Sequence, residues 1–259
     1  MSTASEAASP ARPTPTSLPV IGGVVAAALV ILGGYAGHDV AAYAVLAGGL
    51  TLAWGWPLLL ELPRPTGTSV VLAAGALGMA GVVLFAGDDS DGTKAISLVL
   101  AIALVLAFLH QLVRTDGRTS LTVSLAGCAL GLVLLASGAF GAAAASYDTG
   151  AAALAVAVGT PALGLIADAL LPAEHEHEWS IPAGVLLGVI LGLILGVTGD
   201  GAWPELLITG LVAGLVGASL RRVLRQLDSL DPAGRLSYGI AVVLATGVLA
   251  YAAQWVINH

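Results

Sequence analysis

Residues 184–196 read Gly-Val-Leu-Leu-Gly-Val-Ile-Leu-Gly-Leu-Ile-Leu-Gly, so that glycine recurs at every fourth position, at Gly184, Gly188, Gly192 and Gly196. In water this stretch would be a poor helix, because each interior glycine costs about 0.5–1 kcal/mol relative to alanine. In lipid the helix must form, because no water is present to satisfy its backbone, and its glycines let a neighbouring helix pack closely. The stretch therefore predicts a glycine zipper in a membrane bundle, either within one chain or between two copies in a homo-oligomer.

The composition of the whole chain points to the same class. Of 259 residues, 58% are hydrophobic and 10% are charged, and the mean hydropathy is +0.96. Soluble domains average about 25% charged residues, so this composition excludes a soluble globular domain. The single cysteine, Cys128, lies in an apolar run and indicates packing rather than chemistry. We expect no catalytic residue, no cofactor and no nucleic-acid partner.

Nine apolar stretches are near the length of about 20 residues that a bilayer requires. They predict an all-α, polytopic transmembrane helix bundle that forms a single domain over residues 18–259. Residues 1–17 are rich in Ser, Thr, Ala and Pro, which predicts a disordered cytoplasmic tail. The expected spans are 19–37, 40–60, 68–86, 95–113, 121–143, 149–171, 181–198, 203–224 and 236–257.

Basic residues are distributed unevenly among the connections between these spans. With nine spans, eight of the nine Lys and Arg residues fall on one side of the membrane, and only Lys94 falls on the other. Because basic residues concentrate in cytoplasmic loops, this pattern predicts a cell-membrane protein with its N-terminus in the cytoplasm and its C-terminus outside. The eight residues are Arg12, Arg64, Arg114, Arg118, Arg221, Arg222, Arg225 and Arg235.

Residues at the span ends are expected to contact the lipid headgroups. Arg221, Arg222 and Arg225 are predicted to contact anionic headgroups at the cytoplasmic face, at roughly 1 kcal/mol per basic residue. Tryptophans near span ends are expected to form the aromatic belts of the two interfaces. These are Trp54, Trp56, Trp179, Trp203 and Trp255.

Two polar residues lie near the ends of spans and are candidates for an intramembrane polar site, Asp168 and His110. A charged group in lipid is costly and therefore marks a functional hypothesis. Asp168 is a residue at the cytoplasmic interface, a residue bonded to a backbone group, or a proton or cation site that faces a cavity. His110 is expected to serve as an anchor at headgroup level.

Residues 174–178, Glu-His-Glu-His-Glu, have the composition of a metal site. His175 and His177 are two positions apart, so they cannot share one face of a helix, and no third histidine is close in sequence. We therefore expect a solvated acidic loop and no metal site, with these two histidines kept as candidate ligands.

Two short motifs carry a resemblance to a known family. Residues 148–151 read Asp-Thr-Gly-Ala, and residues 227–230 read Leu-Asp-Ser-Leu before the final span. Together with the hydropathy layout, they resemble elements of the phosphatidate cytidylyltransferase family, membrane enzymes that make CDP-diacylglycerol. The family's Lys-rich segment and its Lys-Asp and Gly-His-Gly-Gly elements are missing. The resemblance implies a relative that has lost catalysis, and it makes Asp228 a further candidate metal ligand. The expected topology places Asp148 outside and Asp228 inside.

Three classes of function follow from these observations. The scarcity of polar groups within the spans favours a membrane protein without catalytic activity that acts as a scaffold or accessory factor. A permease or channel for a small, neutral or apolar solute is the first alternative, and it predicts a water-accessible cavity near Asp168. A divergent lipid-headgroup enzyme of the CDP-diacylglycerol type is the second alternative. The lipid bilayer is the expected environment in every case.

Overall fold

The long apolar stretches of the chain form helices, as expected of segments whose backbone must be satisfied without water. The structure, a computed structural model, describes residues 17–86, 90–113, 120–170, 176–199, 203–227 and 231–258. The expected tail at 1–17 lies outside these residues, apart from the backbone of Ser17. The helices are α1 (Ser17–Ala36), α2 (His38–Leu59), α3 (Pro65–Ala86), α4 (Ser90–Val113), α5 (Leu121–Ala144), α6 (Gly150–Leu170), α7 (Glu176–Thr198), α8 (Trp203–Leu224), α9 (Pro232–Leu244) and α10 (Gly247–Asn258).

Within the described parts of the chain, nine segments are long and apolar enough to cross a membrane. The expected all-α fold class and the number of spans are therefore confirmed, and the chain is a multi-pass membrane protein. One expectation about the boundaries is wrong: α7 begins at Glu176, so the backbone of His177 is helical rather than part of a loop. Trp179 and Ser180 lead into the apolar run, and Pro182, which lies inside α7, does not end the helix.

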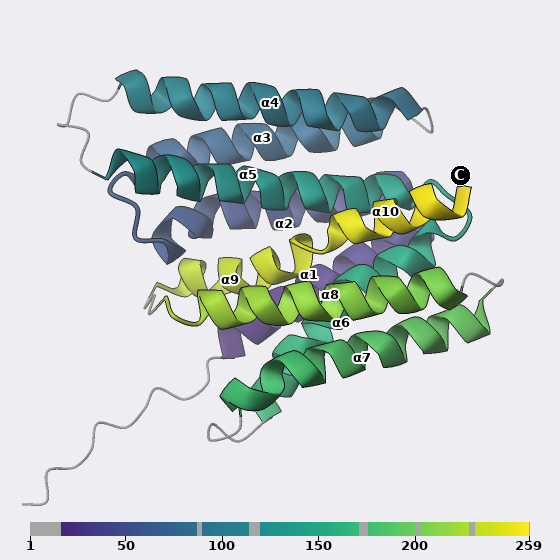
Figure 1. The fold of residues 1–259 in the computed structure, drawn as a ribbon. Coiled ribbons are helices and arrows are strands. Elements are labelled where there is room, and N and C mark those ends of the chain that lie inside the picture. Colours follow the sequence, from purple (N-terminus) through teal and green to yellow (C-terminus); the bar gives the residue numbers. More distant parts are fainter. Residues whose placement is uncertain are drawn as a thin grey trace, which may run out of the picture.

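The spans differ strongly in how much of their surface the protein covers. α6 is the most deeply buried span, whereas α4 and α7 are the least buried. Figure 1 shows α4 and α7 at opposite edges of the bundle, with α9 and α10 running one after the other through its middle. α6 and α9 therefore contribute mainly to the interior, and the outer faces of α4 and α7 are left for lipid.

The ninth span is a broken helix, which the sequence did not predict. α9 ends at Leu244 and α10 begins at Gly247, although the two together form one apolar segment, Pro232–Ile257. The Ser137 hydroxyl of α5 donates to the Ala245 carbonyl at 2.9 Å and accepts from the Val248 amide at 3.0 Å. A helix break inside a membrane is tolerated where the protein satisfies the freed backbone groups, and Ser137 does this here.

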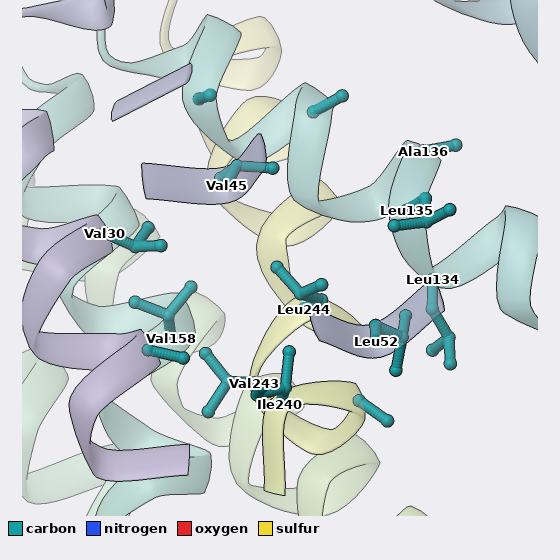
Figure 2. Close-up of a cluster of buried hydrophobic side chains, with 14 of the residues drawn as sticks. Val30, Val45, Leu52, Leu134, Leu135, Ala136, Val158, Ile240, Val243 and Leu244 are labelled. Carbon is teal, nitrogen blue, oxygen red and sulfur yellow. The ribbon is translucent and has the colours of Figure 1, made fainter. Parts of the chain in front are cut away.

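The hydrophobic core surrounds α9. Figure 2 shows side chains of this helix among residues of four other helices, α1, α2, α5 and α6. Every residue of α9 from Ser237 to Leu244 is buried, and Gly239 lies against the backbone of α1. A Cβ at Gly22 would lie 2.8 Å from the Leu236 carbonyl oxygen, and one at Gly55 would overlap the Ala233 carbonyl. The labelled side chains are Val30, Val45, Leu52, Leu134, Leu135, Ala136, Val158, Ile240, Val243 and Leu244.

The glycines of residues 184–196 face α8. A Cβ at Gly188 would overlap the carbonyl of Gly210, and one at Gly192 would overlap the carbonyl of Leu206. Gly184 and Gly196 approach the backbone near Gly214 and Trp203 in the same way. These contacts lie within one chain.

One tryptophan departs from the expected interface position. Trp56 is fully buried, and its indole Nε1 donates to the Gly127 carbonyl at 2.8 Å, so this side chain joins α2 to α5. The other four are half exposed or more, as side chains facing lipid or headgroups would be. These are Trp54, Trp179, Trp203 and Trp255.

Candidate functional site

The last turn of α8 carries an arginine whose side chain points into the protein. Arg221 is only 1% exposed. Its guanidinium lies against glycines of α6 and α7: a Cβ at Gly164 would overlap the Nη1 atom, and one at Gly184 would lie 3.3 Å from the Nη2 atom. A Cβ at Gly217 would lie 3.5 Å from Nη1. Small residues on three helices thus provide the volume that the arginine head occupies.

Arg221 is paired with Asp168 near the end of α6. The Nε atom of Arg221 donates to Oδ2 of Asp168 at 2.6 Å, and Asp168 is 7% exposed. Arg225, which follows α8 and is less buried, pairs with the same carboxylate oxygen. A buried carboxylate needs such partners, because an uncompensated charge in a medium of low dielectric constant is strongly disfavoured. The two arginines therefore bind the end of α6 to the end of α8.

This ion-pair cluster, defined as Asp168, Arg221 and Arg225, has one carboxylate for two guanidinium groups. Tyr238 of α9 interacts with Arg225 and lies within the electrostatic range of the other two side chains. Oδ1 of Asp168 and both Nη atoms of Arg221 are buried without a hydrogen-bond partner among the described residues. The cluster therefore places charged groups at this end of the bundle.

A cleft lies at the opposite end of α6. It has a volume of about 550 Å³, which is within the size range of small-molecule sites. It lies between the α1–α2 turn, the α5–α6 connection and the end of α7. Ala152 of α6 lines the cleft, and it is 16 residues, or about 24 Å of helix, from Asp168. The polar side chains of the lining come from Tyr35, Tyr147, Asp148, Thr149 and Thr198.

The polar groups of the cleft are held by bonds to the surrounding helices. Thr149 donates to Oε1 of the buried Gln254 of α10 at 2.9 Å. The rings of Tyr147 and Tyr251 meet edge to face with centroids 6.4 Å apart. Burial, and then the electrostatic interaction and hydrogen bond with Tyr251, raise the pKa of Tyr147 above its ordinary value of 10.0.

Of the residues singled out in the sequence, the structure brings together Asp168, Arg221 and Arg225. Asp168 is bonded to side chains rather than to the backbone, and the cleft does not adjoin it but lies at the other end of α6. Arg221 is directed into the bundle, whereas Arg222 is exposed. The predicted headgroup contacts of the arginines stay predictions.

The remaining candidate residues are not part of either feature. The ring of His110 lies against Gly67 of α3, and its buried Nε2 atom has no hydrogen-bond partner among the described residues. His175 and Asp228 lie outside the described residues, and nothing is described of the His177 side chain. No group of three or more possible metal ligands occurs in the described parts of the chain.

The sequence did not identify the cleft residues as a site. Asp148 appeared only in the resemblance, and Tyr35 and Tyr147 appeared nowhere. The available signal was that all three lie at span ends on the same side of the predicted topology, next to connections that carry almost no basic residues.

The geometry also bears on the two motifs of the resemblance. Asp148 precedes the first residue of α6, whereas Arg225, Leu227 and Asp231 lie beyond the end of α8, where Arg225 contacts Asp168. The described residues that flank the second motif are therefore separated from Asp148 by the length of α6, about 30 Å. The resemblance stays a prediction. Comparison with known proteins finds no matching family model, no matching curated protein and no matching solved structure.

Proposed function

We propose that this membrane protein is a permease for a small solute. The observation that carries the proposal is the cleft of about 550 Å³ at one end of α6, with polar side chains at its wall. Ligand sites in proteins are concave and combine apolar walls with a few placed polar groups, and this lining has that character.

The two ends of α6 support the proposal because they differ. Its first turn lines the cleft, and its last turn is closed by the ion-pair cluster. A carrier that is open at one end and closed at the other has this arrangement, and opening the closed end would require the Asp168–Arg221 bond to break. The broken span α9–α10 packs against α6, and Gln254 of α10 accepts the hydrogen bond of Thr149 at the cleft wall.

The test is solute uptake into liposomes that contain the purified protein, with a screen of radiolabelled amines, amino acids, sugars and carboxylates. We expect at least one solute to accumulate above the level of protein-free liposomes. Ala152→Trp, which places a large side chain at the cleft wall, should abolish this uptake. Ala47→Trp is the matched control, because Ala47 is exposed on the outer face of α2. Uptake of no solute by a correctly folded protein, or uptake that survives Ala152→Trp, would contradict the proposal.

A scaffold or accessory role without catalysis is the second candidate. It is supported by the buried polar groups that bond to one another within the chain, such as Ser137 at the helix break and Asp168 at the cluster. A complementation experiment in cells that lack the protein distinguishes the two candidate functions. Restoration of their growth by the Ala152→Trp variant would favour the scaffold, whereas restoration by Ala47→Trp alone would favour transport.

A further inference from the structure

Three polar side chains of the cleft act as hydrogen-bond acceptors toward it. The Thr149 hydroxyl donates its hydrogen to Gln254, and the Thr198 hydroxyl donates its hydrogen to the Ile194 carbonyl at 2.8 Å. A hydroxyl group has one hydrogen, so toward the cleft these two groups can only accept. The carboxylate of Asp148 is likewise an acceptor when ionised.

Three backbone amides of the cleft wall are already bonded. The amides of Gly37, Tyr147 and Gly199 donate to the carbonyls of Gly33, Ala144 and Leu195. The first turn of α6, with Ala151 and Ala152, adds backbone N–H groups to the wall. Among the described residues of the lining there is no Lys, Arg or His. The side chains of Asp148, Thr149 and Thr198 therefore present acceptors and one negative charge to the cleft.

Two aromatic side chains complete this environment. Tyr35 lies at the end of α1 and is 60% exposed, and the phenol of Tyr147, like that of Tyr35, is neutral at physiological pH. The face of a neutral aromatic ring carries partial negative charge and attracts cations. The sequence adds to the same field, since the connections at this end carry Asp39, Asp148 and Asp200 but no Lys or Arg between the first and second, fifth and sixth, and seventh and eighth spans.

From these observations we infer that the cleft binds a small organic ammonium ion, whose N–H groups bond to Asp148, Thr149 and Thr198 and whose charge lies near Tyr35 and Tyr147. This inference replaces the neutral or apolar solute expected from the sequence. It rests on the proposed permease function only for the claim that the bound ion is also transported. Binding at the cleft is measured separately from transport.

The test is a binding measurement on the purified full-length chain in lipid nanodiscs by isothermal titration calorimetry. The probe is phenethylammonium, and the controls are 2-phenylethanol, which is neutral, and phenylacetate, which is anionic, both of similar shape. We expect phenethylammonium to bind about tenfold or more tightly than either control, because hydrogen bonds to a charged group are the stronger kind. Equal binding of the three compounds would overturn the inference.

Variants assign the binding to the cleft. Asp148→Asn keeps the shape of the side chain and should weaken phenethylammonium binding about tenfold or more. Asp39→Asn is the matched control, because Asp39 lies at the same end but outside the lining, and it should lower the affinity much less than Asp148→Asn does. Tyr35→Leu should weaken binding roughly two- to fivefold, whereas Tyr35→Phe, which keeps the ring, should not. An affinity that Asp148→Asn does not change would overturn the inference.

The outcomes for binding and for transport are distinguishable. Phenethylammonium that binds at Asp148 but is not taken up by liposomes would support the inference and contradict the permease. Uptake of phenylacetate without binding of the ammonium probe would support the permease and overturn the inference.

Discussion

At the scale of residues, the burial of Arg221 depends on what its neighbours lack. Gly164, Gly184 and Gly217 have no side chain where the guanidinium lies, and Asp168 provides the opposite charge. The pair is therefore coupled to close helix packing: a methyl group at Gly164 would occupy the position of the guanidinium. The same glycine-rich surfaces that favour helix association in lipid here make room for a charge.

We predict that Asp168→Leu lowers the free energy of unfolding by about 3–5 kcal/mol, because it leaves the buried Arg221 without its partner. Replacing both side chains, as in Asp168→Leu with Arg221→Met, should recover part of this loss, since no fully buried charge is then left unpaired. Equilibrium unfolding in mixed detergent micelles measures both. A double variant as unstable as the sum of the two single variants would contradict this account.

The sequence identified Asp168 and the three arginines but not their pairing. Asp168 and Arg221 are 53 residues apart, so no local pattern shows their pairing. The direction of Arg221 was present in the sequence, because Gly210, Gly214 and Gly217 precede it at helical spacing and mark the face of α8 that packs against other helices. The glycines on α6 and α7 that make room for the guanidinium are revealed only by the three-dimensional packing.

At the scale of elements, the break between α9 and α10 depends on one hydroxyl group. Residues 245–247 read Ala-Thr-Gly within an apolar run, and a single glycine is too common in this chain to indicate a break. Ser137, more than 100 residues earlier, supplies the hydrogen bonds that make the break tolerable. A contact so distant in sequence cannot be predicted from local propensity.

We predict that Ser137→Ala lowers the free energy of unfolding by about 1–3 kcal/mol, because the Ala245 carbonyl and the Val248 amide would be left unpaired in the bundle. Ser124→Ala is the matched control on the same helix. Ser124 is also buried, but its hydroxyl has no hydrogen-bond partner among the described residues, so its removal should cost little or nothing. Thermal unfolding of both variants in one detergent gives the comparison, and equal losses would refute the assigned role of Ser137.

The α7–α8 pair provides a second prediction for elements. A Cβ at Gly188 would overlap the Gly210 carbonyl, so Gly188→Ala should force the helices apart and lower the free energy of unfolding by about 1–3 kcal/mol. Gly81→Ala in α3 is the control, because a Cβ there has no atom within 4 Å and should leave stability unchanged or slightly raised. Unfolding in detergent measures both variants. If Gly188→Ala changed the free energy of unfolding as little as Gly81→Ala does, the packing role of Gly188 would be refuted.

At the scale of the whole molecule, the number of spans and their apolar character followed directly from the sequence, because lipid requires long apolar helices. What did not follow was which spans form the interior. α6 and α7 both contain long apolar runs, yet α6 is the most buried span and α7 is among the least buried. Hydropathy reflects the free energy of moving a side chain out of water. That free energy is similar whether the side chain then contacts a neighbouring helix or a lipid tail, so hydropathy does not show which spans are buried.

The orientation of the bundle is a prediction from the basic residues. Cys128 is buried, so replacing it with Ala gives a background for single cysteines on the two ends. We predict that Asp39→Cys reacts with an impermeant maleimide on intact cells, whereas Pro63→Cys reacts only after the membrane is permeabilised. Both positions are exposed and lie on opposite ends of α2. The reverse pattern of labelling would show that the cleft opens toward the cytoplasm.

The central position of α9 has a consequence for biosynthesis. Its glycines and small residues lie against α1 and α2, yet the ribosome must produce α3 to α8 before α9 leaves the exit tunnel. Until then, the first two helices of the nascent chain have no permanent neighbour on that side, and lipid or a chaperone of the insertion machinery must cover them. The bundle therefore cannot complete its packing span by span but only after α9 has been translated. A chain truncated after α8 would lack the helix around which the other helices pack.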